Sequence, residues 1–152
     1  GFGMEVYAFD PFMTDEQIKA AGATPLHSAE EMYKKCQYIS LHIPATEQTK
    51  KSINYNLLKD MPKGAVLVNT ARQEVIDEEG LAKLMEERND FHYITDIAPV
   101  CDCFSKFEGR FFATPKKMGA QTEEANVNAG LAAAHQIVNF FEKGDQKFKV
   151  NK

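Results

Sequence analysis

Three side chains of types that bind cofactors and carboxylates stand at or just after the ends of short apolar runs: Asp10, Arg72 and Asp96. The carboxyl ends of parallel strands share one edge of an open α/β sheet, and ligands bind in the crevice there. An aspartate at this edge can accept hydrogen bonds from adenosine ribose hydroxyls, and its charge repels a 2′-phosphate, which favours NAD over NADP. A guanidinium fork binds a carboxylate through two parallel hydrogen bonds. Asp10 and Arg72 therefore indicate a dinucleotide site and a carboxylate site.

Each of these residues also has a purely structural interpretation. Asp10 precedes a proline, which is common turn chemistry, and Arg72 could be an exposed loop arginine. Clustering is the stronger argument, because Asp10, the stretch 69–72 and Asp96 follow successive strands at the same edge. His42 ends a further strand at this edge and is a rival catalytic base, or else a packing or cofactor-contact residue.

A pair of lysines, Lys116 and Lys117, follows Thr114-Pro115 after the last predicted strand. Adjacent positive charges near an arginine disfavour one another. A lysine with a lowered pKa can act as a general base, or as a proton donor in the reverse direction. The alternative is two solvated surface lysines, and the residues alone favour that alternative.

The cysteines are three in number, Cys36, Cys101 and Cys103. An odd count in a chain of this size predicts free thiols in a reducing compartment rather than a disulfide framework. Cys101-Asp102-Cys103 has no second Cys/His pair at ligand spacing, so we expect no metal.

The chain has 152 residues, of which 43% are hydrophobic and 26% are charged, as in one ordinary globular domain. A formal net charge of −4 gives no electrostatic reason to bind nucleic acid or an anionic membrane. No apolar run reaches the roughly 20 residues of a membrane-spanning helix, and no signal peptide is visible. We therefore expect a cytoplasmic protein.

Short apolar runs alternate with amphipathic stretches, which predicts an α/β fold with a parallel sheet. Strands are expected at Met4–Phe9, Tyr38–His42, Ala65–Asn69, Phe91–Asp96 and Arg110–Ala113. Helices are expected to begin at Thr14, Ser28, Asn54, Asp77 and Thr122, the last ending at Gly144. An apolar seam on the last helix is predicted at Val127, Leu131, Ala134, Val138 and Phe141. The stretch Pro99–Gly109 is predicted to be irregular.

The strand, G-x-G-x-x-G turn and helix that open a dinucleotide fold are missing from this pattern. Gly1-Phe2-Gly3 cannot be that turn, because no strand precedes it and a strand follows at once. We expect a Rossmann-like parallel sheet that is incomplete at its N-terminal unit. Residues 1–121 would be a partial dinucleotide-binding domain.

The sequence resembles the D-2-hydroxyacid dehydrogenase family over nearly its whole length. The matching stretches are Ala8-Phe9-Asp10-Pro11, Leu41-His42-Ile43-Pro44 with Thr46 and Thr49, Lys63-Gly64-Ala65 through Asn69-Thr70-Ala71-Arg72, and Val75-Ile76-Asp77-Glu78.

The resemblance implies an NAD site lined by Asp10, Ile43, Pro44, Thr49, Thr70, Ala71, Arg72, Asp96 and Gly119. Asp10 would hold the adenosine ribose, and Asp96 would contact the nicotinamide end. Arg72 would bind the substrate carboxylate and polarise the reacting C2 oxygen. Hydride would pass between C2 of a 2-hydroxy acid and the nicotinamide, while a base takes the hydroxyl proton.

Two positions depart from the family pattern. The family normally has a glutamate five residues after the aspartate that matches Asp96, and Cys101 stands there. It normally has a histidine after Thr-Pro, where Lys116 stands, whereas counting backward from the following Gly-Ala selects Lys117. The segment Thr114–Thr122 is similar to a branch of short D-3-phosphoglycerate dehydrogenases that use lysine here. A lysine needs no carboxylate to orient a ring tautomer, so losing the histidine together with the glutamate is chemically coherent.

That branch implies NAD-dependent oxidation of D-3-phosphoglycerate to 3-phosphohydroxypyruvate, in serine biosynthesis, by a homodimer. The resemblance also implies a separate substrate domain that is missing from the sequence, with residues 122–152 as a crossover helix and tail toward it. One alternative is a glyoxylate or hydroxypyruvate reductase of the same family, and another is a catalytically inactive NAD(H)-binding protein. Because the phosphate-binding turn and the substrate domain are missing from the sequence, we expect the 152 residues alone to show no dehydrogenase activity.

Overall fold

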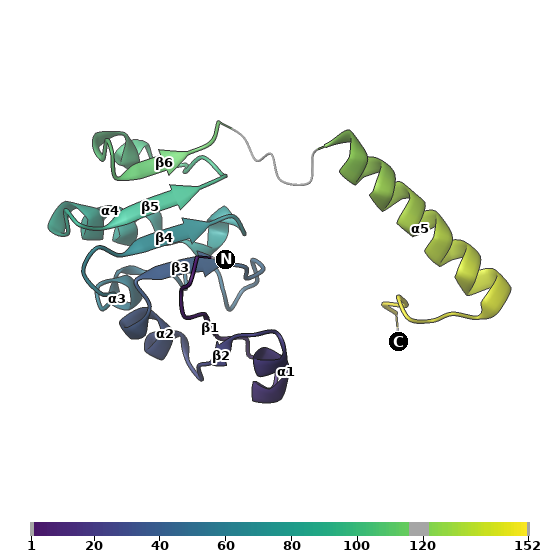
Figure 1. Ribbon diagram of the computed structural model, residues 1–152. Coiled ribbons are helices and arrows are strands. Elements are labelled where there is room, and N and C mark those ends of the chain that lie inside the picture. The colour runs from purple at the N-terminus through teal and green to yellow at the C-terminus, as the bar shows by residue number, and fades with distance from the viewer. Residues whose placement is uncertain (1, 116–121, 152) are drawn as a thin grey trace. The chain divides into compact units, whose positions relative to one another are not determined.

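The computed structural model describes residues 2–115 and 122–151, which form two compact units (Figure 1). The first unit is an α/β domain built on parallel strands, and the second is a long helix with a short tail. The expected domain boundary after residue 121 stays a prediction, because residues 116–121 lie outside the described residues.

The main sheet of the first unit has four parallel strands in the order β3, β4, β5, β6. They are β3 (Tyr38–Leu41), β4 (Val66–Asn69), β5 (His92–Thr95) and β6 (Phe111–Ala113). The last residues of the strands are paired with one another across the sheet, so that the strands end together at one edge. The prediction of a Rossmann-like α/β fold with a parallel sheet is confirmed.

A second, smaller sheet consists of β1 (Tyr7–Ala8) and β2 (Thr24–Pro25), also parallel. The strand predicted over the longer run Met4–Phe9 is confirmed only toward its C-terminal end, where β2 supplies a partner. Val6 remains 59% exposed, so the rest of the run is not buried in the described residues. The sequence did not predict β2, because Thr24-Pro25 shows no alternation of apolar and polar residues. The strand that was expected to precede β1 in a complete dinucleotide fold stays a prediction.

The helices of the first unit are α1 (Asp15–Ala20), α2 (Ala29–Lys35), α3 (Tyr55–Leu58) and α4 (Glu78–Glu87). Each begins one residue after the predicted starting residue. The predicted capping box of α1 is confirmed, because the Thr14 hydroxyl accepts from the Gln17 N–H and the Gln17 side chain accepts from the Thr14 N–H. Asp77 occupies the predicted N-cap of α4, but its side chain makes no capping hydrogen bond.

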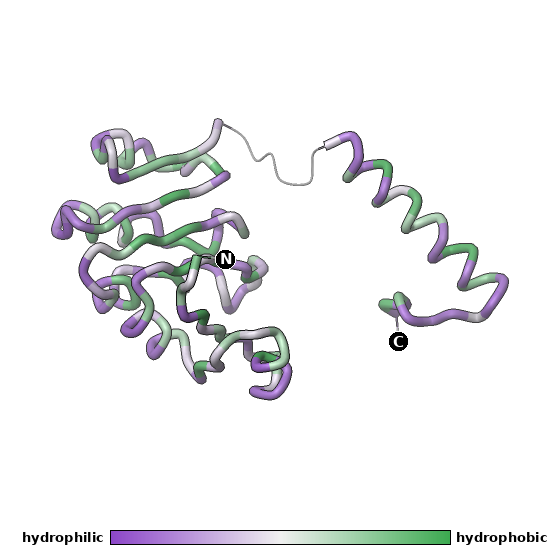
Figure 2. The backbone as a smooth tube through the Cα atoms, in the orientation of Figure 1, coloured by the Kyte–Doolittle hydropathy of each residue, from purple (hydrophilic) through white to green (hydrophobic). Residues whose placement is uncertain are grey.

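The hydrophobic core lies on one face of the main sheet. Side chains alternate along the strands, so that Leu41, Leu67 and Tyr93 are buried against the helices. On α4 the predicted apolar face is buried at Leu81, Leu84 and Met85. The opposite face of the sheet exposes the larger apolar side chains of Tyr38, Ile94 and Phe112. Figure 2 shows how hydrophobic residues concentrate along the strands.

The stretch Pro99–Gly109, predicted to be irregular, contains the 3-10 helix η2 (Asp102–Lys106). Phe104 and Phe107, both in this stretch, are buried. The Phe104 ring packs with Tyr93 at 5.8 Å, with Phe111 at 5.1 Å and with Phe107 at 6.1 Å between ring centroids. Because aromatic rings contribute much apolar area to a core, they anchor the stretch to β5 and β6. The prediction of an irregular loop is therefore wrong over residues 102–106.

The second unit consists of α5 (Glu123–Lys143) and the residues that follow it. The predicted N-cap is confirmed, because the Thr122 hydroxyl accepts from the Ala125 N–H. The predicted C-cap is also confirmed: Gly144 has a φ of +64°, a conformation that favours glycine. No side chain of α5 is buried within the described residues, so the predicted apolar seam is exposed there.

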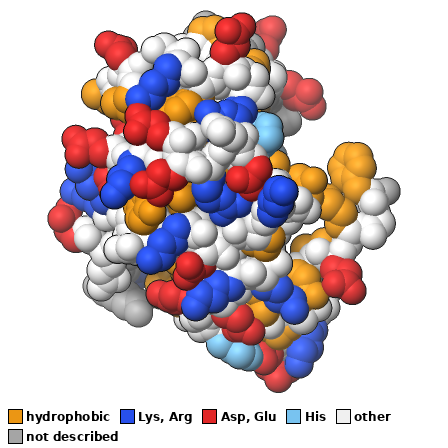
Figure 3. Space-filling model, turned by 90° about the vertical axis from the view of Figure 1, so that its left-hand side faces the viewer, with side chains coloured by type: hydrophobic (Ala, Val, Ile, Leu, Met, Phe, Trp, Pro, Cys, Tyr) orange, Lys and Arg blue, Asp and Glu red, His pale blue; other side chains and the backbone are white. Residues whose placement is uncertain are grey.

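The surface at the amino ends of the main strands carries acidic and basic side chains interspersed (Figure 3). Neither sign gathers into a large area, so this face offers no concentrated field for a polyanion. Among the described helices, none combines the length and the apolar character needed to cross a bilayer.

Candidate functional site

A crevice with a volume of about 350 Å³ lies at the carboxyl edge of the main sheet. Its walls are the residues that follow β3 and β4: His42, Ile43, Pro44, Thr70, Ala71 and Arg72. The strands on either side end level with each other, because Leu41 pairs with Asn69. Six residues from two separate stretches of sequence therefore meet where an open parallel sheet binds its ligands.

The turn after β4 is shaped by the fully buried side chain of Asn69. Its Nδ2 donates to the Arg72 carbonyl oxygen at 2.9 Å, and its Oδ1 accepts from the Ala71 N–H at 3.0 Å. A buried asparagine whose amide both donates to and accepts from the backbone fixes the conformation of a turn, as backbone hydrogen bonds do elsewhere. The conformation of Thr70, Ala71 and Arg72 therefore depends on Asn69.

Arg72 is exposed at the mouth of the crevice. Its Nη1 donates to the Ala71 carbonyl oxygen at 2.8 Å. A guanidinium has five N–H donors, so this single bond leaves donors with which it can bind a carboxylate.

Asp96 follows β5 and meets the turn after β4. Its N–H donates to the Asn69 carbonyl oxygen at 3.4 Å, and the buried Thr95 hydroxyl donates to the same oxygen at 2.9 Å. The Asp96 Oδ1 is buried and has no hydrogen-bond partner among the described residues. A buried carboxylate oxygen without a donor is costly, so it marks a place where a ligand N–H or O–H is expected.

Asp10 stands two residues after the end of β1, with its carboxylate in a local turn. Its Oδ1 accepts from the Phe12 N–H at 2.8 Å, as the structural interpretation of this residue expects. A carboxylate has two oxygens, so this bond occupies one and leaves the ribose role chemically open.

The loop after β3 is held by its own threonines. The Thr49 hydroxyl donates to the Pro44 carbonyl oxygen at 2.6 Å and accepts from the Thr46 N–H at 2.8 Å. Thr49 therefore shapes the wall formed by Ile43 and Pro44, and does not itself line the crevice. His42 lines the crevice, and its Nε2 lies 3.0 Å from the Ser40 hydroxyl.

Lys116, Lys117 and Gly119 lie outside the described residues. The described residue Thr114 follows β6, and its N–H donates to the Thr95 carbonyl oxygen at 3.2 Å. The last described residues before the lysines therefore follow β6 at the edge that also carries Asp96.

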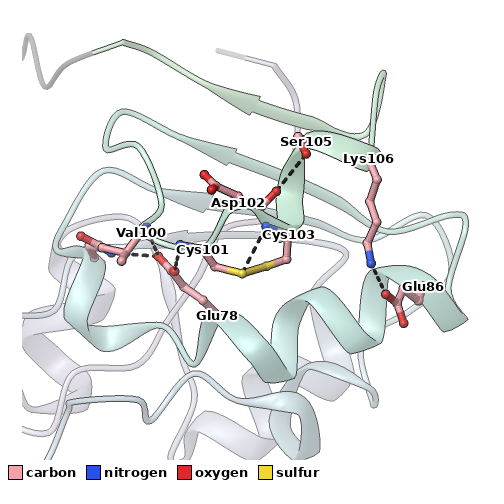
Figure 4. The surroundings of a disulfide bond; sticks show 9 residues. Glu78, Glu86, Val100, Cys101, Asp102, Cys103, Ser105 and Lys106 are labelled. Carbon is pink, nitrogen blue, oxygen red and sulfur yellow. Dashed lines mark hydrogen bonds and ion pairs between the residues drawn. A yellow bond between two sulfur atoms is a disulfide. The ribbon is translucent and has the colours of Figure 1, made fainter.

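The structure joins Cys101 and Cys103 in a disulfide, with their Cα atoms 5.2 Å apart (Figure 4). The prediction of three free thiols is therefore wrong for these two, and among the described cysteines only Cys36 is free. An odd count leaves one cysteine over but does not prevent the other two from pairing. Within the described residues, no group of three or more side chains is placed to hold a metal ion.

Sequence reasoning passed over two residues that organise this edge, Thr95 and Glu78. Thr95 is a polar residue at a position of β5 that faces the core, and its 2% exposure calls for a hydrogen-bond partner. Glu78 could be read from the sequence only as a first-turn acid of α4, because its partners come from other loops.

Residues 1–102, more than half of the chain, match the family model for the NAD-binding domain of D-isomer specific 2-hydroxyacid dehydrogenases. The chain belongs to this family. The predicted family and NAD as the family's cofactor are both confirmed by this match.

Individual relatives are consistent with the family. D-3-phosphoglycerate dehydrogenase of Bacillus subtilis is 32% identical over 142 residues, which cover 91% of this chain and 27% of that protein. Hydroxypyruvate reductase of Thermotoga maritima is 29% identical over 142 residues, which cover 90% of this chain and 45% of that protein. The crystal structure of NAD⁺-bound 3-phosphoglycerate dehydrogenase of Entamoeba histolytica is 52% identical, with a TM-score of 0.85 over 99% of this chain and 48% of that one. The chain spans less than half of the length of each of these relatives.

Proposed function

We propose that this chain forms the cofactor-binding part of an enzyme that oxidises D-3-phosphoglycerate to 3-phosphohydroxypyruvate with NAD. The observation that carries the proposal is the crevice between the loops after β3 and β4, with Arg72 at its mouth. At the same sheet edge, a buried Asp96 oxygen has no hydrogen-bond partner among the described residues. Relatives named as phosphoglycerate dehydrogenases in bacteria and in Entamoeba histolytica support the choice of substrate.

NAD fits the residues of this edge. Its nicotinamide carboxamide would donate to the buried Asp96 Oδ1, and its adenosine ribose would donate to the second oxygen of Asp10. Ile43, Pro44, Thr70 and Ala71 would line the cofactor, with Thr49 holding the loop of the first two. Gly119 would approach the cofactor from the segment after β6. When bound, NAD supplies the carbon that accepts a hydride.

Arg72 would bind the substrate carboxylate and polarise the oxygen on C2. As the C2–H bond breaks and its electron pair leaves as hydride, the C2 hydroxyl loses its proton and becomes a carbonyl. A neutral lysine amine would take that proton, and we assign this role to Lys116, with Lys117 as the alternative. Only the neutral form of a lysine amine can take a proton, so this role requires a lysine with a lowered pKa.

Lysine as the acid–base residue agrees with the state of Cys101. A catalytic imidazole needs a carboxylate or carbonyl partner to set its tautomer, whereas an amine does not. Cys101 stands where the family has that glutamate, and its sulfur is bonded to Cys103. The loss of the relay carboxylate is therefore matched by a base that does not use one.

A second candidate is reduction of hydroxypyruvate or glyoxylate, which the 29% identity to a hydroxypyruvate reductase favours. A third is a catalytically inactive NAD(H)-binding protein. We further propose that the enzyme acts as a cytoplasmic homodimer whose product enters serine biosynthesis, and that the 152 residues alone do not turn over substrate.

The test measures NADH formation by the protein that carries this chain, with D-3-phosphoglycerate, beside Lys116→Ala and Lys117→Ala. NAD binding by each variant is measured in parallel by calorimetry. We expect turnover by the parent, and loss of turnover with retained NAD binding in one variant only. Oxidation of NADH with hydroxypyruvate or glyoxylate, without NADH formation from phosphoglycerate, would favour the second candidate, and NAD binding without turnover in either direction the third.

A further inference from the structure

The carboxylate of Glu78 lies between the two loops that carry Arg72 and Asp96. Glu78 is the first residue of α4 and is half-buried. Its Oε1 accepts from the Gln73 Nε2 at 2.9 Å and from the Val100 N–H at 3.1 Å. Its Oε2 accepts from the Cys101 N–H at 2.8 Å, so that three donors surround one carboxylate (Figure 4).

These donors belong to the two loops at the ligand edge. Gln73 directly follows Arg72 and opens η1 (Gln73–Val75), the 3-10 helix after β4. Val100 and Cys101 belong to the loop that begins at Asp96 after β5. Both loops are also joined near the sheet, where the Asn69 carbonyl oxygen accepts from Thr95 and Asp96. Glu78 is a second link between them, farther along both loops.

A carboxylate suits this position for two reasons. It is acceptor-only, so both oxygens can serve donors at once, whereas a glutamine would turn an NH₂ group toward a backbone N–H. Its charge also lies at the N-terminus of a ten-residue helix, which favours a negative group.

We propose that Glu78 is a positioning residue that fixes the substrate-binding Arg72 loop relative to the Asp96 loop. This inference rests on the proposed function. Hydride transfer depends on the distance between the substrate carbon and the cofactor carbon, and a misplacement of about 1 Å can cost roughly a hundredfold in rate. Glu78 touches neither reactant, and acts by holding both loops in one arrangement.

The decisive variant is Glu78→Gln, with Glu79→Gln as its matched control. Glu79 is the next residue of the same helix turn, carries the same charge and is exposed. In the enzyme that carries this chain, we expect Glu78→Gln to lower kcat with phosphoglycerate by about tenfold to a hundredfold. Glu79→Gln should retain the parent's kcat and KM. Wild-type kcat in Glu78→Gln would overturn the proposal.

Hydrogen exchange in the 152-residue chain supplies a readout that does not need activity. The Val100 and Cys101 amides donate to Glu78, so their exchange should accelerate in Glu78→Gln while the β4 and β5 amides stay protected. Unchanged exchange at both amides would overturn the positioning role even if the proposed reaction is correct. Accelerated exchange in a protein that never turns over phosphoglycerate would reject the proposed function alone.

A second variant keeps the test decisive if Glu78→Gln lowers the Tm so far that kinetics cannot be compared. Gln73→Met removes only the donor on the Arg72 side and leaves both backbone bonds of Glu78. We expect a raised KM for phosphoglycerate, because Arg72 holds the substrate carboxylate and Gln73 directly follows it. A Gln73→Met enzyme with the parent's KM would overturn the proposal.

Discussion

The fully buried Asn69 side chain donates to the carbonyl oxygen of Arg72 at 2.9 Å, so the residue that ends β4 sets the backbone of the arginine three residues later. Asn69→Ala would leave the Arg72 carbonyl and the Ala71 N–H without this partner. We expect a loss of about 1–3 kcal/mol in the free energy of unfolding. Asn69→Asp can accept from Ala71 but turns a buried carboxylate oxygen toward the Arg72 carbonyl oxygen, and should lose at least as much. Urea denaturation of the 152-residue chain measures both, and equal stability of parent and Asn69→Ala would contradict the role given to Asn69.

The positions of the main strands and of the helix starts could be predicted from the sequence. Apolar runs located β3 to β6, because a strand buried on one face needs several consecutive apolar or alternating residues. Local cap chemistry located the helix starts, as Thr14 with Gln17 shows. The observed strands are shorter than the runs, because pairing stops where the neighbouring strand ends.

What the sequence could not predict depends on contacts between distant segments. Glu78 receives donors from Gln73 on one side and from residues 100 and 101 on the other, and no local pattern records such a meeting. The packed stretch around Phe104 was predicted to be irregular for the same reason, since its rings are buried against β5 and β6. At the candidate site, Asp10 accepts from the Phe12 N–H as a turn aspartate does. This bond does not decide whether Asp10 also binds a ribose.

Arg88 and Asp90 predict a pH dependence of stability. The Arg88 guanidinium donates to both Asp90 oxygens, at 3.3 Å and 2.6 Å, and the Gly64 N–H donates to one of them at 2.7 Å. These hydrogen bonds, the arginine's first, hold the pKa of Asp90 well below its usual range. A depressed folded-state pKa stabilises the fold above the unfolded value of about 3.9, and this contribution is lost as the pH falls through the folded-state value.

The variant that tests this contribution is Asp90→Asn. We expect it to cost about 1–2 kcal/mol at pH 7, because the Asp90 side chain is 29% exposed and solvent screens part of the charge. The difference between parent and variant should shrink as the pH is lowered below about 4. Unfolding free energies at pH 7, 5 and 3 would reveal it, and a difference independent of pH would contradict the assignment to Asp90.

At Gly80, in the first turn of α4, we expect an alanine to destabilise the fold, although helix propensity alone predicts that it stabilises. A Cβ at this position would lie 2.4 Å from the Asp77 Oδ2 and 3.1 Å from the backbone N of Tyr55. Gly80→Ala should therefore destabilise by about 1–3 kcal/mol, although alanine alone favours a helix over glycine by about 1 kcal/mol. Gly130→Ala in α5 is the matched control, because nothing lies within 4 Å of its Cβ. Circular dichroism should show higher helicity for Gly130→Ala, and a more stable Gly80→Ala would be inconsistent with this packing.

The disulfide between Cys101 and Cys103 predicts the count of reactive thiols. Of the three cysteines, only Cys36 should react with iodoacetamide in unfolded, unreduced protein, and all three should react after treatment with dithiothreitol. Mass spectrometry of the alkylated chain separates these states, and three labels before reduction would contradict the bond.

Reduction of the disulfide should change the Tm little, because a loop closed over a sequence separation of 2 restricts the unfolded chain only slightly. The Cys101 N–H bond to Glu78 and the buried Phe104 hold the two sides of the pair without it. Activity of the enzyme that carries this chain should therefore persist after reduction, whereas its loss would make the disulfide part of the active-site support.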